Sequence, residues 1–151
     1  MERLLADEAA TIAWGKLLGE VASQGLVIAL YGRLGAGKTS FVKGLAKGLG
    51  IEEDLQSPTF TLVCEYEEGR VPLYHIDLYR LGEQANLEIA MFDDYFYREG
   101  ICAIEWAELL ERYLPDDRLI VQLRDEQACR VMTVKATGPL SQSIYDRWLE
   151  S

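Results

Sequence analysis

The stretch "GRLGAGKT", residues 32–39, has the residue types and spacing of a phosphate-binding loop, G-x-x-x-x-G-K-[ST]. Its glycines permit backbone angles that point consecutive N–H groups at one phosphate, and a following helix adds the partial positive charge of its N-terminus. Lys38 is spaced to reach the β- and γ-phosphates of a nucleotide, and the Thr39 hydroxyl is spaced to bind magnesium. The alternative is a glycine-rich turn that only joins a strand to a helix, and the lysine and threonine argue against it.

The sequence lacks the motif by which proteins with this loop usually recognise guanine. Guanine-selective proteins with this loop usually carry N-K-x-D, and the single asparagine, Asn86, lies in "QANLE". We therefore expect ATP as the nucleotide, with Mg²⁺ as its metal.

The elements that must position this loop are indicated on both sides of it. The continuous apolar run "GLVIALYG" predicts a buried parallel strand over residues 25–32, and residues 38–50 read as a helix that ends at glycines. Its apolar face comprises Phe41, Val42, Leu45, Ala46 and Leu49. A first helix is predicted over residues 7–22 behind a possible Asp7 cap. Its apolar residues at helical spacing are Ala9, Ile12, Ala13, Leu17 and Val21.

The rest of the chain predicts more strands and one more long helix. In chain order these are a hairpin of 60–67 and 71–79 around "EGR", a mixed segment 83–99, a buried strand 101–106, a short helix that stops at Pro115, a hairpin of 118–125 and 129–137, and a helix 139–150. This order indicates an α/β protein with a three-layer fold like that of P-loop NTPases. We expect a parallel central sheet with flanking antiparallel strands, in a single domain of residues 1–151.

Two acids end predicted strands and are candidates for the metal and for catalysis. In "VPLYHIDLY", alternation puts His75 and Asp77 on one face, and a buried acid needs a cation, a backbone donor or a metal shell. Alternatively, His75 and Asp77 satisfy each other or bind a nearby arginine such as Arg80. In "ICAIEWAE", Glu105 follows an apolar strand and could orient an attacking water or contact the metal. Alternatively, Glu105 belongs only to the start of the next helix.

Two further residues lie where they could touch the nucleotide. Thr59, in "SPTF", offers a hydroxyl to magnesium or the γ-phosphate from a loop that Pro58 stiffens, although a simple Ser-Pro turn is the alternative. Trp106 follows Glu105 and could form a wall of the site. Alternatively, it only packs in the core.

The overall composition is that of a globular protein, with 49% hydrophobic and 26% charged residues. No run of 18 apolar residues occurs, and the acidic start "MERLLADEAAT" is unlike a signal peptide, so we expect a cytoplasmic location. The net charge of −10 disfavours unaided binding to nucleic acid. Cys64, Cys102 and Cys129 lie in apolar runs and are expected to be buried, reduced thiols.

Four motifs in this order, "GRLGAGKTS", "SPTF", "HIDLYR" and "EWAE", make the sequence similar to the bacterial TsaE (YjeE) family. Its members are small P-loop ATPases needed for the threonylcarbamoyl modification of adenosine in tRNA. The resemblance covers nearly the whole chain, since "TIAWGKLL" is similar to the family's first helix and "FDDYFYREGICAIEW" to its central segment. The loop alone is generic, whereas its combination with the other three motifs is highly specific.

The resemblance implies roles for the residues of these motifs. ATP would be bound by Gly32, Leu34, Gly35, Ala36, Gly37, Lys38, Thr39 and Ser40, with Thr59 in a nucleotide-sensing loop and Trp106 as the paired aromatic. Lys38, Asp77 and Glu105 would be catalytic, and Thr39, Asp77 and Glu105 would hold Mg²⁺. Which of the two acids contacts the metal directly stays open. Relatives often have an acid where this chain has Arg33.

The resemblance also implies partners. The ATPase would act on a TsaB–TsaD pair and reset it between turnovers, and tRNA would be met only through that complex, which suits an acidic protein. Two other functions are weighed against this one. A small-molecule kinase usually needs a lid of clustered arginines, and here Arg112, Arg118, Arg124 and Arg130 are scattered. A non-catalytic module would bind its partners only when a nucleotide is bound. It differs from the ATPase only in whether Glu105 supports hydrolysis.

Overall fold

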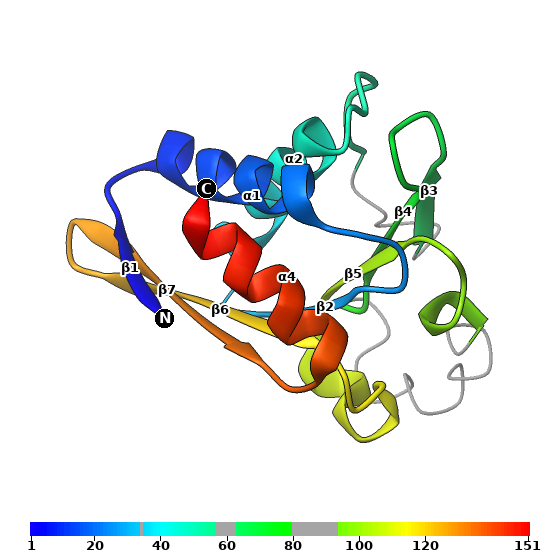
Figure 1. Ribbon diagram of the computed structural model, residues 1–151. Coiled ribbons are helices and arrows are strands. Elements are labelled where there is room, and N and C mark those ends of the chain that lie inside the picture. The colour runs from blue at the N-terminus through cyan, green and yellow to red at the C-terminus, as the bar shows by residue number, and fades with distance from the viewer. Residues whose placement is uncertain (34, 57–62, 80–93) are drawn as a thin grey trace.

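A seven-stranded sheet forms the centre of the molecule (Figure 1). The computed structural model describes residues 1–33, 35–56, 63–79 and 94–151. In spatial order the strands are β1 (Glu2–Leu5), β7 (Cys129–Ala136), β6 (Leu119–Glu126), β2 (Val27–Tyr31), β5 (Ile101–Glu105), β4 (Leu73–Asp77) and β3 (Val63–Tyr66). The central strands β6, β2, β5 and β4 run parallel, and the outer pairings β1–β7, β7–β6 and β3–β4 are antiparallel. This arrangement confirms the predicted fold class.

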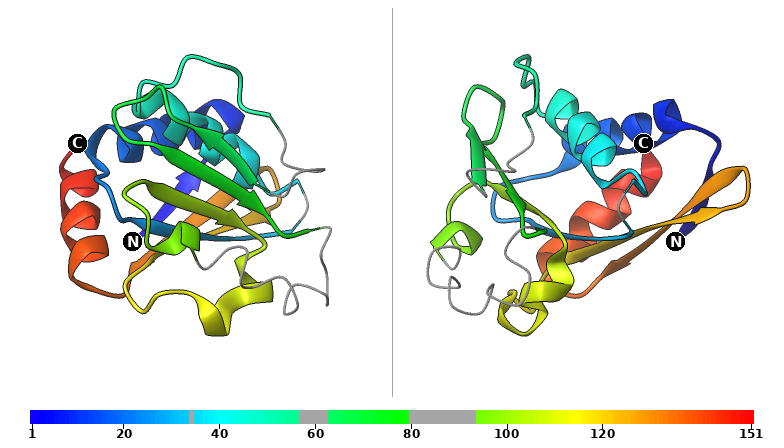
Figure 2. Two further views of the ribbon diagram at one scale, coloured as in Figure 1. Left: turned by 90° about the vertical axis from the view of Figure 1, so that its right-hand side faces the viewer. Right: turned by 180° about the vertical axis from the view of Figure 1, so that it is seen from behind.

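Helices cover both faces of the sheet and complete three layers. Three helices, α1 (Glu8–Val21), α2 (Lys38–Gly48) and α4 (Pro139–Glu150), pack on one face together with alternate residues of β2 such as Ile28 and Leu30. The other residues of β2, Val27 and Ala29, pack on the opposite face with the 3-10 helix η2 (Ala107–Tyr113). In the left view of Figure 2 the sheet lies between α1 and α2 above and η2 below. Because both faces are covered, the parallel strands are apolar throughout, as their sequence indicates.

Most predicted elements lie within a few residues of the observed ones. The Asp7 cap is confirmed, because its Oδ1 accepts a hydrogen bond from the Ala10 N–H at 2.9 Å. Strand β1 was not predicted, and the short helix after β5 is a 3-10 helix with a non-helical residue, Leu110, inside it. Residues 60–62 of the first hairpin and 83–93 of the mixed segment lie outside the described residues.

The predicted apolar face of α1 is not the face that is most buried. The buried residues of this helix are Thr11, Gly15, Leu18 and Gly19. The cause is close packing against α2: a Cβ on Gly15 would collide with the carbonyl oxygen of Phe41, and one on Gly44 of α2 with that of Ile12. The two helices approach each other across glycines, so a pattern of large apolar residues does not mark their contact.

This close approach predicts that Gly44→Ala destabilises the protein. Although alanine favours a helix more than glycine does, the added methyl group has no space beside the Ile12 backbone. We expect the free energy of unfolding to fall by about 1–3 kcal/mol, the usual effect of overpacking. Urea denaturation measures it, with Lys43→Ala at an exposed position of α2 as the control. An unfolding midpoint equal to that of the wild type would contradict this packing.

The remaining expectations concern the thiols and the membrane. Cys102 is buried, which raises the pKa of its thiol, whereas Cys64 and Cys129 are only partly buried. Burial is therefore confirmed for Cys102 and wrong for the other two. Cys64 lies on the edge strand β3, and Cys129 is the first residue of β7, beyond the last residue of β7 that pairs with β1. Within the described ranges, no helix has the length and apolar character needed to cross a membrane.

Candidate nucleotide-binding site

The predicted phosphate loop joins the end of β2 to the start of α2. Gly37 is the N-cap residue of α2 and has φ +107°, a left-handed value that favours glycine. Gly32 has φ +152°, and a Cβ there would lie 2.6 Å from the carbonyl oxygen of Leu123 on β6. The backbone of the loop thus requires glycine where the motif has it. Leu34, a predicted member of the loop, lies outside the described residues.

The loop lysine, Lys38, is buried against the ring of Trp106. Only 4% of Lys38 is exposed, its Nζ donates to the Gly32 carbonyl oxygen at 2.5 Å, and it lies 3.5 Å from the centre of the Trp106 ring. Burial lowers the pKa of Lys38, and the negative charge of Glu105 opposes that change. Trp106 therefore flanks the site and does more than fill the core.

The Thr39 hydroxyl contacts the carboxylate of Glu105. Its Oγ1 lies 3.1 Å from Oε1 and 3.2 Å from Oε2 of Glu105. Thr39 is in the first turn of α2, and Glu105 is the last residue of β5, the strand beside β2. A glutamate that is only 3% exposed thus faces the hydroxyl that the motif assigns to magnesium.

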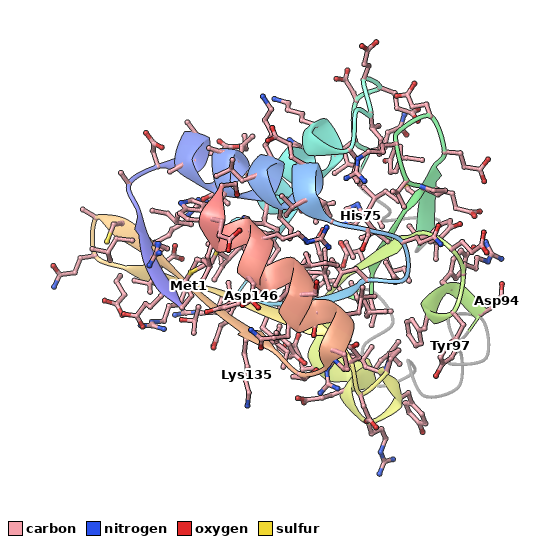
Figure 3. All side chains as sticks on the ribbon, in the orientation of Figure 1. Met1, His75, Asp94, Tyr97, Lys135 and Asp146 are labelled. Carbon is pink, nitrogen blue, oxygen red and sulfur yellow. The ribbon has the colours of Figure 1, made fainter. Side chains whose placement is uncertain are left out.

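Strands β4 and β5 bring the second acid and the histidine to the same place. The parallel register pairs Asp77 with Glu105 and His75 with Ala103, so all four residues point to the α2 face of the sheet. The Nε2 of His75 lies 2.5 Å from Oε2 of Glu105, whereas Asp77 accepts a hydrogen bond at its Oδ1 from the Tyr79 N–H at 3.0 Å. Figure 3 labels His75 inside the molecule, in contrast to Lys135 and Asp94 at the surface.

These contacts decide between the interpretations that the sequence left open. The described hydrogen bond of His75 is to Glu105 and not to Asp77, and Arg80 lies outside the described residues. Glu105 does not serve the next helix, because η2 has no side-chain hydrogen bond at its N-cap and the Glu105 carboxylate faces His75 and Thr39. Alternation along one strand predicted the shared face of His75 and Asp77 but not the partner from the neighbouring strand.

Asp77 is more exposed than Glu105. It is half-buried, and burial raises the pKa of its carboxyl group. The charge of nearby Glu105 raises it further, while the hydrogen bond from the Tyr79 backbone lowers it. The side chain is thus a carboxylate of increased basicity beside the Glu105–Thr39 pair.

Trp106 adopts an unusual backbone conformation at the end of β5. Its φ is +61°, which a bulky residue rarely adopts, and its ring packs against that of Tyr79 with centroids 5.1 Å apart. The chain turns sharply here and places the ring over Lys38. Strain of this kind often accompanies functional sites.

Sequence reasoning missed two contacts of predicted site residues, those of Gly35 and Ser40. Arg130 of β7 reaches across, with Nη2 3.5 Å from the Gly35 carbonyl oxygen, and a Cβ on Gly37 would lie 2.6 Å from its Nη1. Ser40 donates to Oε1 of Glu8 on α1 at 3.0 Å, so its hydroxyl serves the contact between helices. Neither contact has a signal in the sequence, because both depend on elements far apart in the chain. Thr59 lies outside the described residues.

The oxygen atoms of Thr39 and Glu105 are chemically suited to Mg²⁺. This metal prefers hard oxygen ligands, and in nucleotide sites it usually takes one or two from the protein and the others from phosphates and water. Among the residues that the structure describes, no group of three or more His, Cys, Asp or Glu side chains forms a metal site. The hydroxyl–carboxylate pair next to a phosphate loop thus fits a magnesium that arrives with a nucleotide.

Comparison with known proteins identifies the family. The family model described as "Threonylcarbamoyl adenosine biosynthesis protein TsaE" matches residues 5–132. The chain belongs to the TsaE family. A relative from Bacillus subtilis, named as the tRNA threonylcarbamoyladenosine biosynthesis protein TsaE, is 46% identical over 129 residues, which are 85% of this chain and 80% of the relative. A TsaE of the same name from Nostoc is 52% identical over 123 residues, 79% of this chain and 75% of the relative.

A solved structure supports the same assignment for the fold. The crystal structure of Bacillus subtilis YdiB has a TM-score of 0.85 and 36% identity, and the match covers 99% of this chain and 94% of that one. The resemblance of the sequence to the TsaE family is thereby confirmed, together with the α/β fold that it implies.

Proposed function

We propose that this chain is a Mg²⁺-dependent ATPase that serves the threonylcarbamoyl modification of adenosine in tRNA. The observation that carries the proposal is the contact of Thr39 with Glu105 next to a complete phosphate loop. The names of its TsaE relatives supply the pathway.

Each part of the site has a task in ATP hydrolysis. The loop amides and Lys38 bind the phosphates and stabilise the charge that develops when water attacks the γ-phosphorus and the bond to the bridging oxygen breaks. Thr39 and Glu105 would hold Mg²⁺, which neutralises phosphate charge when it is bound. The Trp106 ring lies against the Lys38 ammonium and would help to hold it at the loop.

The two acids divide their work according to their contacts. Glu105 faces the Thr39 hydroxyl and is therefore the acid placed to bind the metal. Asp77 is more exposed, and burial raises the pKa of its carboxyl group, which makes it a stronger proton acceptor than an ordinary aspartate. We therefore assign the orientation of the attacking water to Asp77 and the metal to Glu105.

The contacts of Lys38 support slow turnover by the isolated chain. To reach a phosphate, Nζ must exchange its hydrogen bond to Gly32 and its contact with the Trp106 ring for new partners. A partner protein that shifts Trp106 would remove part of that cost. The proposed partners are TsaB and TsaD, which would hold the tRNA that a chain of net charge −10 is poorly suited to bind.

We expect the ATPase rate of the isolated chain to be low and to rise when a TsaB–TsaD pair is added. Release of inorganic phosphate measures the rate, and a pull-down with and without ATP and Mg²⁺ measures the complex. TsaB alone and TsaD alone are the controls. Full activity of the isolated chain that the pair leaves unchanged would contradict the dependence on partners.

A further inference from the structure

His75 is the single histidine of the chain, and it is completely buried. It lies on the α2 face of β4, in line with Leu73, which belongs to the apolar core. A polar ring at such a position is costly unless it is hydrogen-bonded, and an aliphatic residue would fill the core without that cost. The packing of the core therefore does not account for a histidine here.

The ring makes its hydrogen bond to the carboxylate that faces Thr39. Nε2 of His75 lies 2.5 Å from Oε2 of Glu105. The register explains why these side chains meet: His75 pairs with Ala103, whose methyl group leaves room for the longer Glu105 two residues further on the same face. Asp77, the other acid on this face, takes its donor from the Tyr79 backbone instead.

The rotation of the Glu105 carboxylate is fixed by a second donor and not by the Thr39 hydroxyl alone. The Thr39 Oγ1 is nearly equidistant from both oxygens of Glu105, at 3.1 and 3.2 Å, and a hydroxyl has one proton to donate. Thr39 alone therefore does not fix the rotation of the carboxylate. The bond from His75 holds Oε2 and leaves Oε1 with the Thr39 hydroxyl as its described partner.

The other ring nitrogen indicates which atom carries the proton. Nδ1 of His75 is buried and has no hydrogen-bond partner in the part of the chain that the structure describes. A proton on Nε2 is shared with Glu105, whereas a proton on Nδ1 alone would be a buried donor without an acceptor.

We propose that His75 is a positioning residue that donates from Nε2 to Glu105 and holds its carboxylate in the orientation needed for Mg²⁺. The role of His75 toward Mg²⁺ rests on the proposed function, whereas its contact with Glu105 does not. Partners behind a metal ligand orient it, and their loss usually weakens metal affinity by about 10–100-fold.

The test compares His75→Leu, which removes the donor, with His75→Gln, whose amide nitrogen can replace Nε2. Calorimetry measures ADP binding in EDTA and then the Mg²⁺ needed to saturate the ADP-bound protein. We expect His75→Leu to keep its ADP affinity in EDTA and to need at least about tenfold more Mg²⁺, with most of that loss restored in His75→Gln. An unchanged Mg²⁺ requirement, equal loss in both variants, or loss of ADP binding in EDTA would each overturn the proposal.

A second measurement needs neither metal nor nucleotide, and it remains decisive if His75→Leu fails to fold. Because the chain has one histidine, isotope-labelled histidine gives a single imidazole spectrum in NMR. We expect a proton on Nε2 whose hydrogen-bonded resonance is lost in Glu105→Ala, and a proton on Nδ1 alone would overturn the contact. A wild-type chain with this spectrum that binds no Mg²⁺ with ADP would overturn the proposed function, and with it the metal role of His75, while the contact stands.

Discussion

We expect Lys38→Ala to abolish ATP turnover and to weaken nucleotide binding. In the proposed function this side chain is the cation that the loop directs at the β- and γ-phosphates, and its Nζ already lies at the loop, on the Gly32 carbonyl oxygen. Removing it leaves developing phosphate charge without its nearest protein cation, and a single such donor is often worth a factor of about 100–1,000 in rate. Phosphate release measures turnover, and calorimetry with ADP measures binding.

Two variants separate the charge of Lys38 from its packing. Lys43→Ala removes a lysine from an exposed position of the same helix and should leave turnover unchanged. Lys38→Arg keeps the charge, but a larger, planar guanidinium replaces the compact ammonium that lies on the Gly32 carbonyl oxygen, so we expect low activity. Wild-type turnover in Lys38→Ala would refute the assignment of the loop.

The sequence predicts the elements of this fold better than their contacts. The phosphate loop, its strand and its helix are predictable because their patterns are local. Strand β1 is not, because it is short and is stabilised by pairing with β7 at the other end of the chain. The contact of α1 with α2 is missed for another reason: the residues at closest approach, Gly15 and Gly44, have no side chain to form a pattern.

The candidate site shows the same division between local and distant information. Lys38 and Thr39 follow from the motif, and Asp77 and Glu105 from their positions at strand ends. The contact of His75 with Glu105 requires the order of β4 and β5 in the sheet and their register, which the pattern of either strand alone does not contain. Periodicity therefore identified the acids of the site but not the neighbours that hold them.

We expect Glu105→Ala to spare ATP binding and to slow hydrolysis by about 100-fold or more. The loop amides and Lys38, which we propose bind the phosphates, do not depend on this carboxylate, so affinity measured in EDTA should persist. Hydrolysis depends on it because Glu105 is the acid in contact with the Thr39 hydroxyl. Phosphate release at saturating ATP and Mg²⁺ measures the rate, with Glu99→Ala, an exposed acid just before β5, as the control.

Glu105→Gln decides whether the protein works through hydrolysis or through the bound nucleotide alone. The amide keeps the size of the side chain beside His75 but carries no charge for Mg²⁺. If this variant still forms an ATP-dependent complex with TsaB and TsaD but no longer supports repeated modification of tRNA, hydrolysis resets the pair. If it supports modification at the wild-type rate while its ATPase activity is lost, the chain is a nucleotide-dependent binding module. Hydrolysis at the wild-type rate in Glu105→Ala would instead assign the chemistry to Asp77 without Glu105, because Asp77 is the remaining acid on this face of β4 and β5 in the described structure.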